Sequence, residues 1–187
     1  MFSPDRRKRL WIQLGAMIVG SLLYSIAIYL TSSIQIPSAD NVQLRPGVVI
    51  PIICGALFGP IPGFVSGFAG SLFADQSLGW GWWPYWYLGN GLMGLFSGLF
   101  RPVSSDYTRL STVFGVLVRA AIGITLGMAI ASISERWITQ SSWDDILWVN
   151  FLPAFLSDLV NAAILVPIIL LFYGILREST ELNQHNL

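Results

Sequence analysis

Long apolar segments constrain this chain more than any other feature. Five or six of them fit into 187 residues, and 54% of the residues are hydrophobic whereas only 11% are charged. A soluble domain of this size carries roughly 25% charged residues. Because a backbone in lipid must satisfy its own hydrogen bonds, a spanning chain forms helices or a closed barrel. The segments are too continuous for barrel strands, so we expect an all-α membrane protein with a six-transmembrane-helix bundle.

We expect a single integral membrane domain over residues 1–187. The stretch Leu10–Leu30 is too long for a signal peptide and is interpreted as a retained first span. Prolines in the segment Gly59–Gly63 block helix continuation, so the second and third spans are expected to be short and separate. The expected spans cover residues 11–30, 47–58, 62–74, 85–100, 110–133 and 148–176.

The distribution of basic residues predicts the orientation of these spans. Cytoplasmic flanks carry an excess of Lys and Arg. With six spans, most basic residues fall on the side of the two termini, and only Arg45 and Arg136 fall on the other. Both termini are therefore expected in the cytoplasm of a bacterium, with the protein in its plasma (inner) membrane as a multi-pass protein. The first side holds Arg6, Arg7, Lys8, Arg9, Arg101, Arg109 and Arg177.

The composition speaks against most enzyme chemistries. Cys54 is the only cysteine and His185 the only histidine, so an intrachain disulfide, a Cys or His metal set and a His-based nucleophilic site are not expected. An aspartyl mechanism needs two carboxylates at one depth, and Asp75 and Asp158 are the only candidates. We therefore expect no enzyme activity, no metal and no cofactor.

Polar side chains in the outer half of the expected bundle indicate a binding site. Ionisable groups at depth are costly and usually face a cavity or a neighbouring helix. The alternative is that Asp158 and Asn161 only bond adjacent helices. The expected site also includes tryptophans from a dense cluster near Trp80, although membrane-interface belts also place Trp there; flat rings stack well on flat heterocycles. The predicted substrate-binding residues are Arg45, Asp75, Trp82, Trp83, Trp86, Asn90, Asp158 and Asn161.

Small residues at four-residue spacing predict close helix packing in lipid. Such rows occur in the third, fourth and fifth expected spans, where packing within the bundle is the simplest interpretation. In the first span, Ala16 and Gly20 have the same spacing. For that pair, contact with another subunit is an open alternative, and the pair is our candidate partner-binding face.

Several short motifs, taken in order, resemble the S component of energy-coupling factor (ECF) transporters. The similarity is strongest over residues 41–100, and the rest agrees in span count and length. The motifs are Asn41-Val42-Gln43, Phe58-Gly59-Pro60-Ile61-Pro62-Gly63, Gly67-Phe68-Ala69-Gly70, Asp75, Gly81-Trp82-Trp83 and Gly89-Asn90-Gly91-Leu92-Met93-Gly94.

The resemblance implies a subunit with six helices that captures a vitamin or related small heterocyclic micronutrient near the outer face. Energy would come from a separate transmembrane T component and two ABC ATPases, and the sequence itself contains no Walker motif. The resemblance further implies that small residues of the first span contact the T component, where this chain has Ala16-xxx-Gly20. The lipid bilayer is the other expected partner, and nucleic acid is not expected.

Two other classes of function remain open at this point. The chain could be a stand-alone small-molecule carrier, although it shows no inverted repeat of the kind that such carriers contain. It could also be a membrane accessory or enzyme-like protein. Tight binding of a ligand without ATP would favour the S component over both.

Overall fold

A computed structural model describes residues 4–34, 45–100 and 106–185. The described residues form helices joined by short connections and contain no β-strand, which confirms the expected all-α class. In chain order the elements are α1 (Pro4–Thr31), the 3₁₀ turn η1 (Pro46–Val48), α2 (Val49–Phe58), α3 (Pro60–Leu78), α4 (Pro84–Gly98), α5 (Leu110–Ile138), the π-helix η2 (Asp145–Phe151) and α6 (Leu152–His185).

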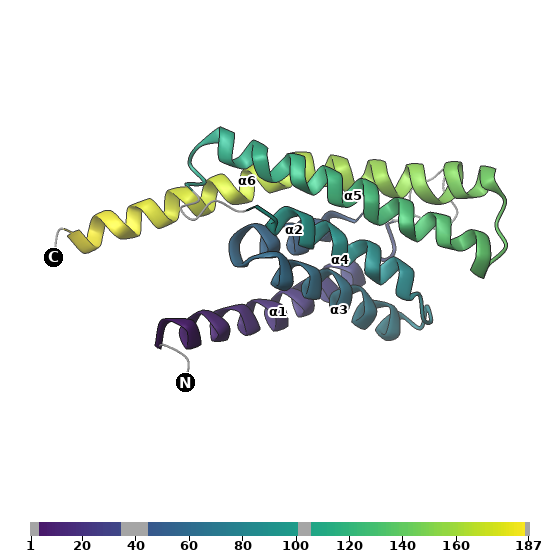
Figure 1. Ribbon diagram of the computed structural model, residues 1–187, viewed down its shortest axis with the longest axis horizontal. Helices are drawn as coiled ribbons and strands as arrows, with labels where there is room; N and C mark the ends of the chain where they lie inside the picture. The colour runs from purple at the N-terminus through teal and green to yellow at the C-terminus, as the bar shows by residue number, and fades with distance from the viewer. Residues whose placement is uncertain (1–3, 35–44, 101–105, 186–187) are drawn as a thin grey trace.

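The helices pack in successive layers (Figure 1). The helices α5 and α6 run side by side in opposite directions, α4 packs between α3 and α5, and α3 packs between α1 and α4. Both termini lie at one end of the bundle, and the α3–α4 and α5–η2 connections lie at the other. We call the second end the connection end.

Within the described residues, three helical segments are long and apolar enough to cross a membrane. They are Asp5–Thr31, Leu110–Ile138 and Asp145–Thr180, and Pro46–Phe58 is a shorter apolar helix. The helix α4 has only 15 residues, which corresponds to about 22 Å at 1.5 Å per residue. A hydrocarbon core is roughly 30 Å thick. A helix as short as α4 does not cross it alone, so the longer helices around it must shield its ends from lipid.

The break predicted in the Gly59–Gly63 segment is present. The helix α2 ends at Phe58, and α3 begins at Pro60. Gly59 between them has a φ of 112°, a conformation that residues with a side chain rarely adopt. Glycine and proline together therefore turn the chain within one residue and let α2 and α3 pack as separate short helices.

Small residues bring the backbones of the central helices into contact, as the four-residue spacing predicts. A Cβ atom added to Gly94 would lie 2.1 Å from the Gly63 carbonyl oxygen, and one added to Gly127 would lie 2.4 Å from that of Gly89. No side chain fits at either place, so these glycines set the α3–α4 and α4–α5 distances. Gly115 differs, because an added Cβ would meet only the Arg119 side chain, at 3.5 Å.

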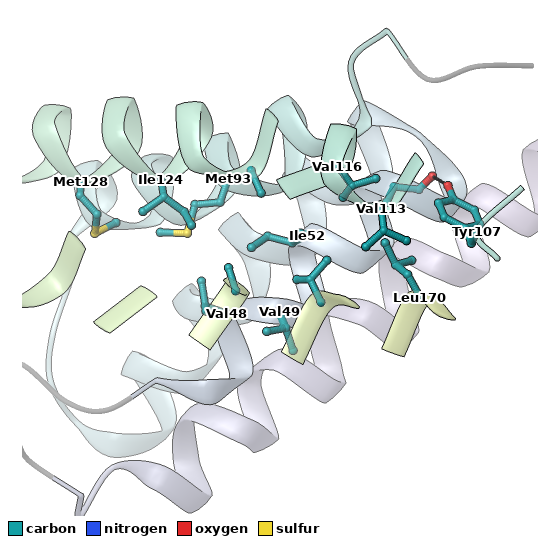
Figure 2. Close-up of a cluster of buried hydrophobic side chains, with 14 of the residues drawn as sticks. Val48, Val49, Ile52, Met93, Tyr107, Val113, Val116, Ile124, Met128 and Leu170 are labelled. Carbon is teal, nitrogen blue, oxygen red and sulfur yellow. Dashed lines mark hydrogen bonds between the residues drawn. The ribbon is translucent and has the colours of Figure 1, made fainter. Parts of the chain in front are cut away.

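A hydrophobic core joins η1, α2, α4, α5 and α6 (Figure 2). At the terminus end of this core the buried Tyr107 hydroxyl donates a hydrogen bond to the Ala56 carbonyl oxygen at 2.6 Å. This bond fixes the start of α5 against α2. The side chains labelled in Figure 2 are Val48, Val49, Ile52, Met93, Tyr107, Val113, Val116, Ile124, Met128 and Leu170.

At the connection end the helices extend beyond the expected spans. The helix α3 continues to Leu78 and α5 to Ile138, so Asp75 and Glu135 lie within helices rather than in loops. The helical path to α6 begins with the π-helix at Asp145, whose amide donates to the Ser142 hydroxyl at 3.1 Å. The extended ends of α3 and α5 line part of a cavity at the connection end.

Candidate functional site

A cavity of about 790 Å³ lies at the connection end. Ligand pockets for small molecules usually measure roughly 300–1,000 Å³, so this volume suits a vitamin-sized compound. The polar side chains of its wall are Ser32, Ser33, Arg45, Ser71, Asp75, Asn90, Glu135, Thr139, Ser141 and Asn150, and the aromatic ones are Trp80, Trp83, Trp86 and Tyr87. They come from α3, α4, α5, η2 and the segments that join helices, including Ser32 and Ser33 just after α1.

Arg45 joins three elements at the floor of the cavity. It lies just before η1, and its Nη2 is 2.7 Å from Oδ2 of Asp158 on α6. Its Nη1 donates a longer hydrogen bond, 3.4 Å, to Oδ1 of Asn90 on α4. The Asp158 side chain is fully buried, whereas 15% of the Arg45 side chain is exposed toward the cavity that it lines. Three of the five polar residues predicted to share this depth, Arg45, Asn90 and Asp158, are therefore in contact here.

Two polar atoms of this ion pair form no hydrogen bond with the described residues. Within the described residues, Oδ1 of Asp158 and Nε of Arg45 are buried without a hydrogen-bond partner. A buried polar atom that lacks a partner costs about 1–3 kcal/mol. The polar floor thus retains free donor and acceptor capacity close to the cavity.

Tryptophans and Tyr87 form the wall supplied by the α3–α4 connection and α4. Nε1 of Trp83 donates to the Trp80 carbonyl oxygen at 2.7 Å. The Tyr87 hydroxyl donates to the Gly81 carbonyl oxygen and accepts from the Trp83 amide, both at 3.1 Å. These bonds hold the connection against α4, so the aromatic faces are fixed before any ligand arrives.

Glu135, on the last turns of α5, belongs to the site although the sequence analysis placed it in a polar loop. It is 8% exposed and lines the cavity. Its carboxylate accepts hydrogen bonds from Nε1 of Trp86 and from Oγ1 of Thr139, each at 2.8 Å. A signal was available: Glu135 continues the row Gly123, Gly127 and Ala131 at four-residue spacing, so a longer α5 places it on the bundle-facing side.

The structure places the predicted site residues in three groups. Asp158 lies behind the wall, bonded to Arg45. Trp82 lies outside the wall, 62% exposed, with its ring edge-on to Tyr87 at a centroid distance of 5.6 Å. Asn161 also lies outside, because it is one turn further along α6, where Nδ2 donates to the Ser157 carbonyl oxygen at 2.8 Å. The remaining five, Arg45, Asp75, Trp83, Trp86 and Asn90, line the cavity.

The predicted partner-binding pair Ala16 and Gly20 has contacts inside the bundle. A Cβ atom added to Gly20 would lie 2.7 Å from Sγ of Cys54 and 2.9 Å from Cβ of Ser66. Packing on α2 and α3 is thus sufficient reason for a glycine there. Both residues also line an apolar groove of about 440 Å³ between α1, α2 and Ile169 of α6. Their role toward a partner remains a prediction.

Arg119, a basic residue in the middle of α5, is bonded to backbone. Its Nε donates to the Ser97 carbonyl oxygen at 3.3 Å. This bond links α5 to the end of α4. Neither Arg119 nor Ser97 is among the residues that line the cavity. We assign Arg119 a packing role between these two helices.

The described residues form an apolar helical bundle with a cavity of small-molecule size at one end, which is the architecture expected of a membrane protein with a binding site. Comparison with known families identifies which one. The chain belongs to the family described as "ECF-type riboflavin transporter, S component", which matches residues 13–177. This is a family of transporter subunits that bind substrate, and the resemblance seen in the sequence is confirmed.

The names of individual relatives do not state a function. The chain is 38% identical over 88 residues to a UPF0397 protein of Vibrio atlanticus (strain LGP32), and the match covers 47% of each chain. A UPF0397 protein of Aliivibrio fischeri (strain MJ11) gives the same figures, and one of Aliivibrio salmonicida (strain LFI1238) is 38% identical over 82 residues, or 44% of each chain. The matched region thus spans about half the length of these curated relatives.

Proposed function

We propose that the chain is the substrate-binding subunit of an ECF-type importer and that it captures a vitamin-like heterocycle in the cavity at the connection end. The observation that carries this proposal is the composition of the cavity wall. Three tryptophans supply flat apolar faces, and Arg45, Asp75, Asn90 and Glu135 supply directional polar groups. Mostly apolar walls with a few placed polar groups are typical of small-molecule sites.

Riboflavin is the first candidate substrate, because the description of the family names it. Its flat ring system suits stacking on an indole. The polar floor around Arg45 and Asn90 provides hydrogen bonds that fix the orientation of such a ring. Other planar micronutrients share this chemistry, and the molecule that co-purifies with the chain would distinguish them.

The proposed topology has six spans, both termini in the cytoplasm and the connection end outside the plasma membrane. The basic run Arg6–Arg9 lies at the terminus end of the bundle. Cytoplasmic flanks of membrane spans are rich in such residues, so this end is assigned to the cytoplasm. The cavity then faces the exterior, where an importer must capture its substrate. Energy would come from a T component and two ABC ATPases, with the groove beside Ala16 and Gly20 as the docking face for the T component.

Neighbouring tryptophans provide a matched test of the binding site. Trp83 lines the cavity, whereas Trp82 lies outside it. A favourable aromatic stack contributes about 1 kcal/mol beyond its buried area. In detergent-purified protein titrated with riboflavin, Trp83→Leu should raise the dissociation constant about fivefold, while Trp82→Leu should leave it within about twofold. Equal changes of the dissociation constant in the two variants would show that the riboflavin ring does not stack on Trp83.

A further inference from the structure

The charges around the cavity do not balance. Among the described residues, the charged side chains of its wall are Arg45, Asp75 and Glu135. Arg45 is already paired with the fully buried Asp158. Neither Asp75 nor Glu135 forms an ion pair with a cationic side chain of the described residues. Two carboxylates are left to set the charge of the space.

The Glu135 carboxylate is bonded only to uncharged side chains among the described residues. Both hydrogen bonds that it accepts come from uncharged donors, an indole and a hydroxyl. The adjacent Arg136 is engaged elsewhere: its Nη1 donates to the Ser141 carbonyl oxygen at 3.0 Å, and its guanidinium lies 5.9 Å from the centroid of the Trp143 ring. Neutral groups therefore position the carboxylate, and no cationic side chain of the described residues forms an ion pair with it.

A second polar group of the wall, Asn90, offers a hydrogen-bond donor to the same cavity. Asn90 lines the cavity and is only 3% exposed. Its Oδ1 accepts from Arg45, whereas its Nδ2 makes no hydrogen bond within the described part of the chain. Nδ2 is not one of the fully buried unpaired atoms, so this donor remains accessible on the cavity wall. A ligand acceptor in the cavity would pair with it.

We propose that the cavity is a charge filter that favours a planar ring ligand carrying a positive charge, accepts a neutral one less well and excludes phosphorylated forms. The inference rests on the proposed function and names the substrate class of that site. Asp75 on α3 and Glu135 on α5 reach the cavity from opposite sides of α4, because α4 packs between those helices. A cationic nitrogen on the ring would be attracted by both carboxylates, and a phosphate would be repelled by both. Charges of one sign in a cleft with low-dielectric walls concentrate ions of the opposite sign.

Thiol labelling tests the charge of the cavity without any knowledge of the substrate. In a Cys54→Ser background, Asn150→Cys would place one thiol in the cavity wall. It is treated with a trimethylammonium-ethyl or a sulfonatoethyl methanethiosulfonate, each of which forms a mixed disulfide and releases methanesulfinate. We expect the rate ratio of cationic to anionic reagent, relative to a free thiol in solution, to exceed about tenfold, since one charge at about 7 Å contributes on the order of 1 kcal/mol at intermediate dielectric.

Neutralising the two carboxylates identifies them as the cause. Either Asp75→Asn or Glu135→Gln should lower the ratio several-fold, whereas Asp144→Asn, at an exposed position outside the cavity wall, should not. Glutamine keeps an acceptor oxygen for the Trp86 indole. A ratio equal to that of the free thiol, or one unchanged in both variants, would overturn the inference.

A matched ligand pair extends the test to binding. Riboflavin should bind at least about tenfold more tightly than riboflavin 5′-phosphate, and the variant with both substitutions should narrow that difference. Equal binding of the two compounds to the wild-type protein would overturn the charge filter while leaving the proposed function intact. Failure of riboflavin to bind, with the labelling ratio preserved, would instead remove riboflavin as the substrate and leave the filter standing.

Discussion

The two halves of the Arg45–Asp158 ion pair should differ in what their loss costs. The Asp158 side chain is fully buried, and one of its oxygens already lacks a partner. Arg45→Ala would therefore leave a carboxylate with no access to water, at a cost of about 4 kcal/mol, within the usual range for an unpaired buried charge. Asp158→Ala would leave a guanidinium that is 15% exposed and lines the cavity. Because water can reach it there, its loss should cost about 2 kcal/mol.

Thermal unfolding of the purified protein without ligand would measure this asymmetry. For a chain of this length each kcal/mol corresponds to about 2–4 °C in Tm, so Arg45→Ala should melt about 4–8 °C below Asp158→Ala. The double variant should lose less than the sum of the two single losses, because it removes both charges. Asp158→Asn, which keeps an acceptor for Arg45, is the matched control and should lie between Asp158→Ala and wild type. Equal melting points for the two alanine variants, or strictly additive losses, would refute the reasoning.

The close backbone contact of α3 and α4 gives a second prediction: Gly94→Ala, which would put Cβ 2.1 Å from the Gly63 carbonyl oxygen, should destabilise the fold by about 3 kcal/mol. Gly15→Ala, at a helical position with no atom within 4 Å of the added Cβ, should change stability by less than about 1 kcal/mol; similar losses would contradict the packing account. The apolar groove gives a third. Val19→Trp, at a residue 55% exposed in the groove wall, should leave riboflavin binding intact and reduce uptake in cells that contain the T component and ATPases, whereas Leu22→Trp, on the same helix but outside that wall, should not. Uptake that is unaffected by Val19→Trp would exclude the groove as a docking face.

Features that depend on local chemistry could be predicted from the sequence. The turn between α2 and α3 follows from two prolines and a glycine, whose restrictions act wherever they occur in a fold. The close α3–α4 contact follows from small residues at four-residue spacing, which in lipid leave backbone packing as the available contact. The shared depth of Arg45 and Asp158 could be predicted from their places in the spans, whereas their ion pair was found only in the structure.

Three residues, Glu135, Trp82 and Asn161, lie elsewhere in the structure than the sequence pattern indicated. Glu135 was assigned to a loop because a charged residue lowers local hydropathy, although a helix end can carry a carboxylate when an indole and a hydroxyl bind it. Trp82 and Trp83 are adjacent and chemically identical, and only the fold of the connection turns one into the cavity and the other away. Asn161 shares a helix face with Asp158, but one helical turn is enough to carry it past the cavity.

Gly20 illustrates a different ambiguity. A small residue on a lipid-facing helix is compatible with contact to a second protein and with contact to the rest of its own chain. Here the space is already occupied by Cys54 and Ser66, so a bulky substitution at Gly20 would disturb the fold as well as any partner. Exposed residues of the same groove, such as Val19, separate the two possibilities.

The central claim is that this chain alone captures a vitamin-like heterocycle in the cavity at its connection end. Equilibrium dialysis of the purified protein against labelled riboflavin, without the T component, the ATPases or ATP, tests it most directly. The account predicts saturable binding of one molecule per chain and a loss of affinity of at least about tenfold in Asn90→Leu, which removes the buried amide on the cavity wall. Binding that needs ATP or the partner proteins, or saturable binding unchanged in Asn90→Leu, would contradict it.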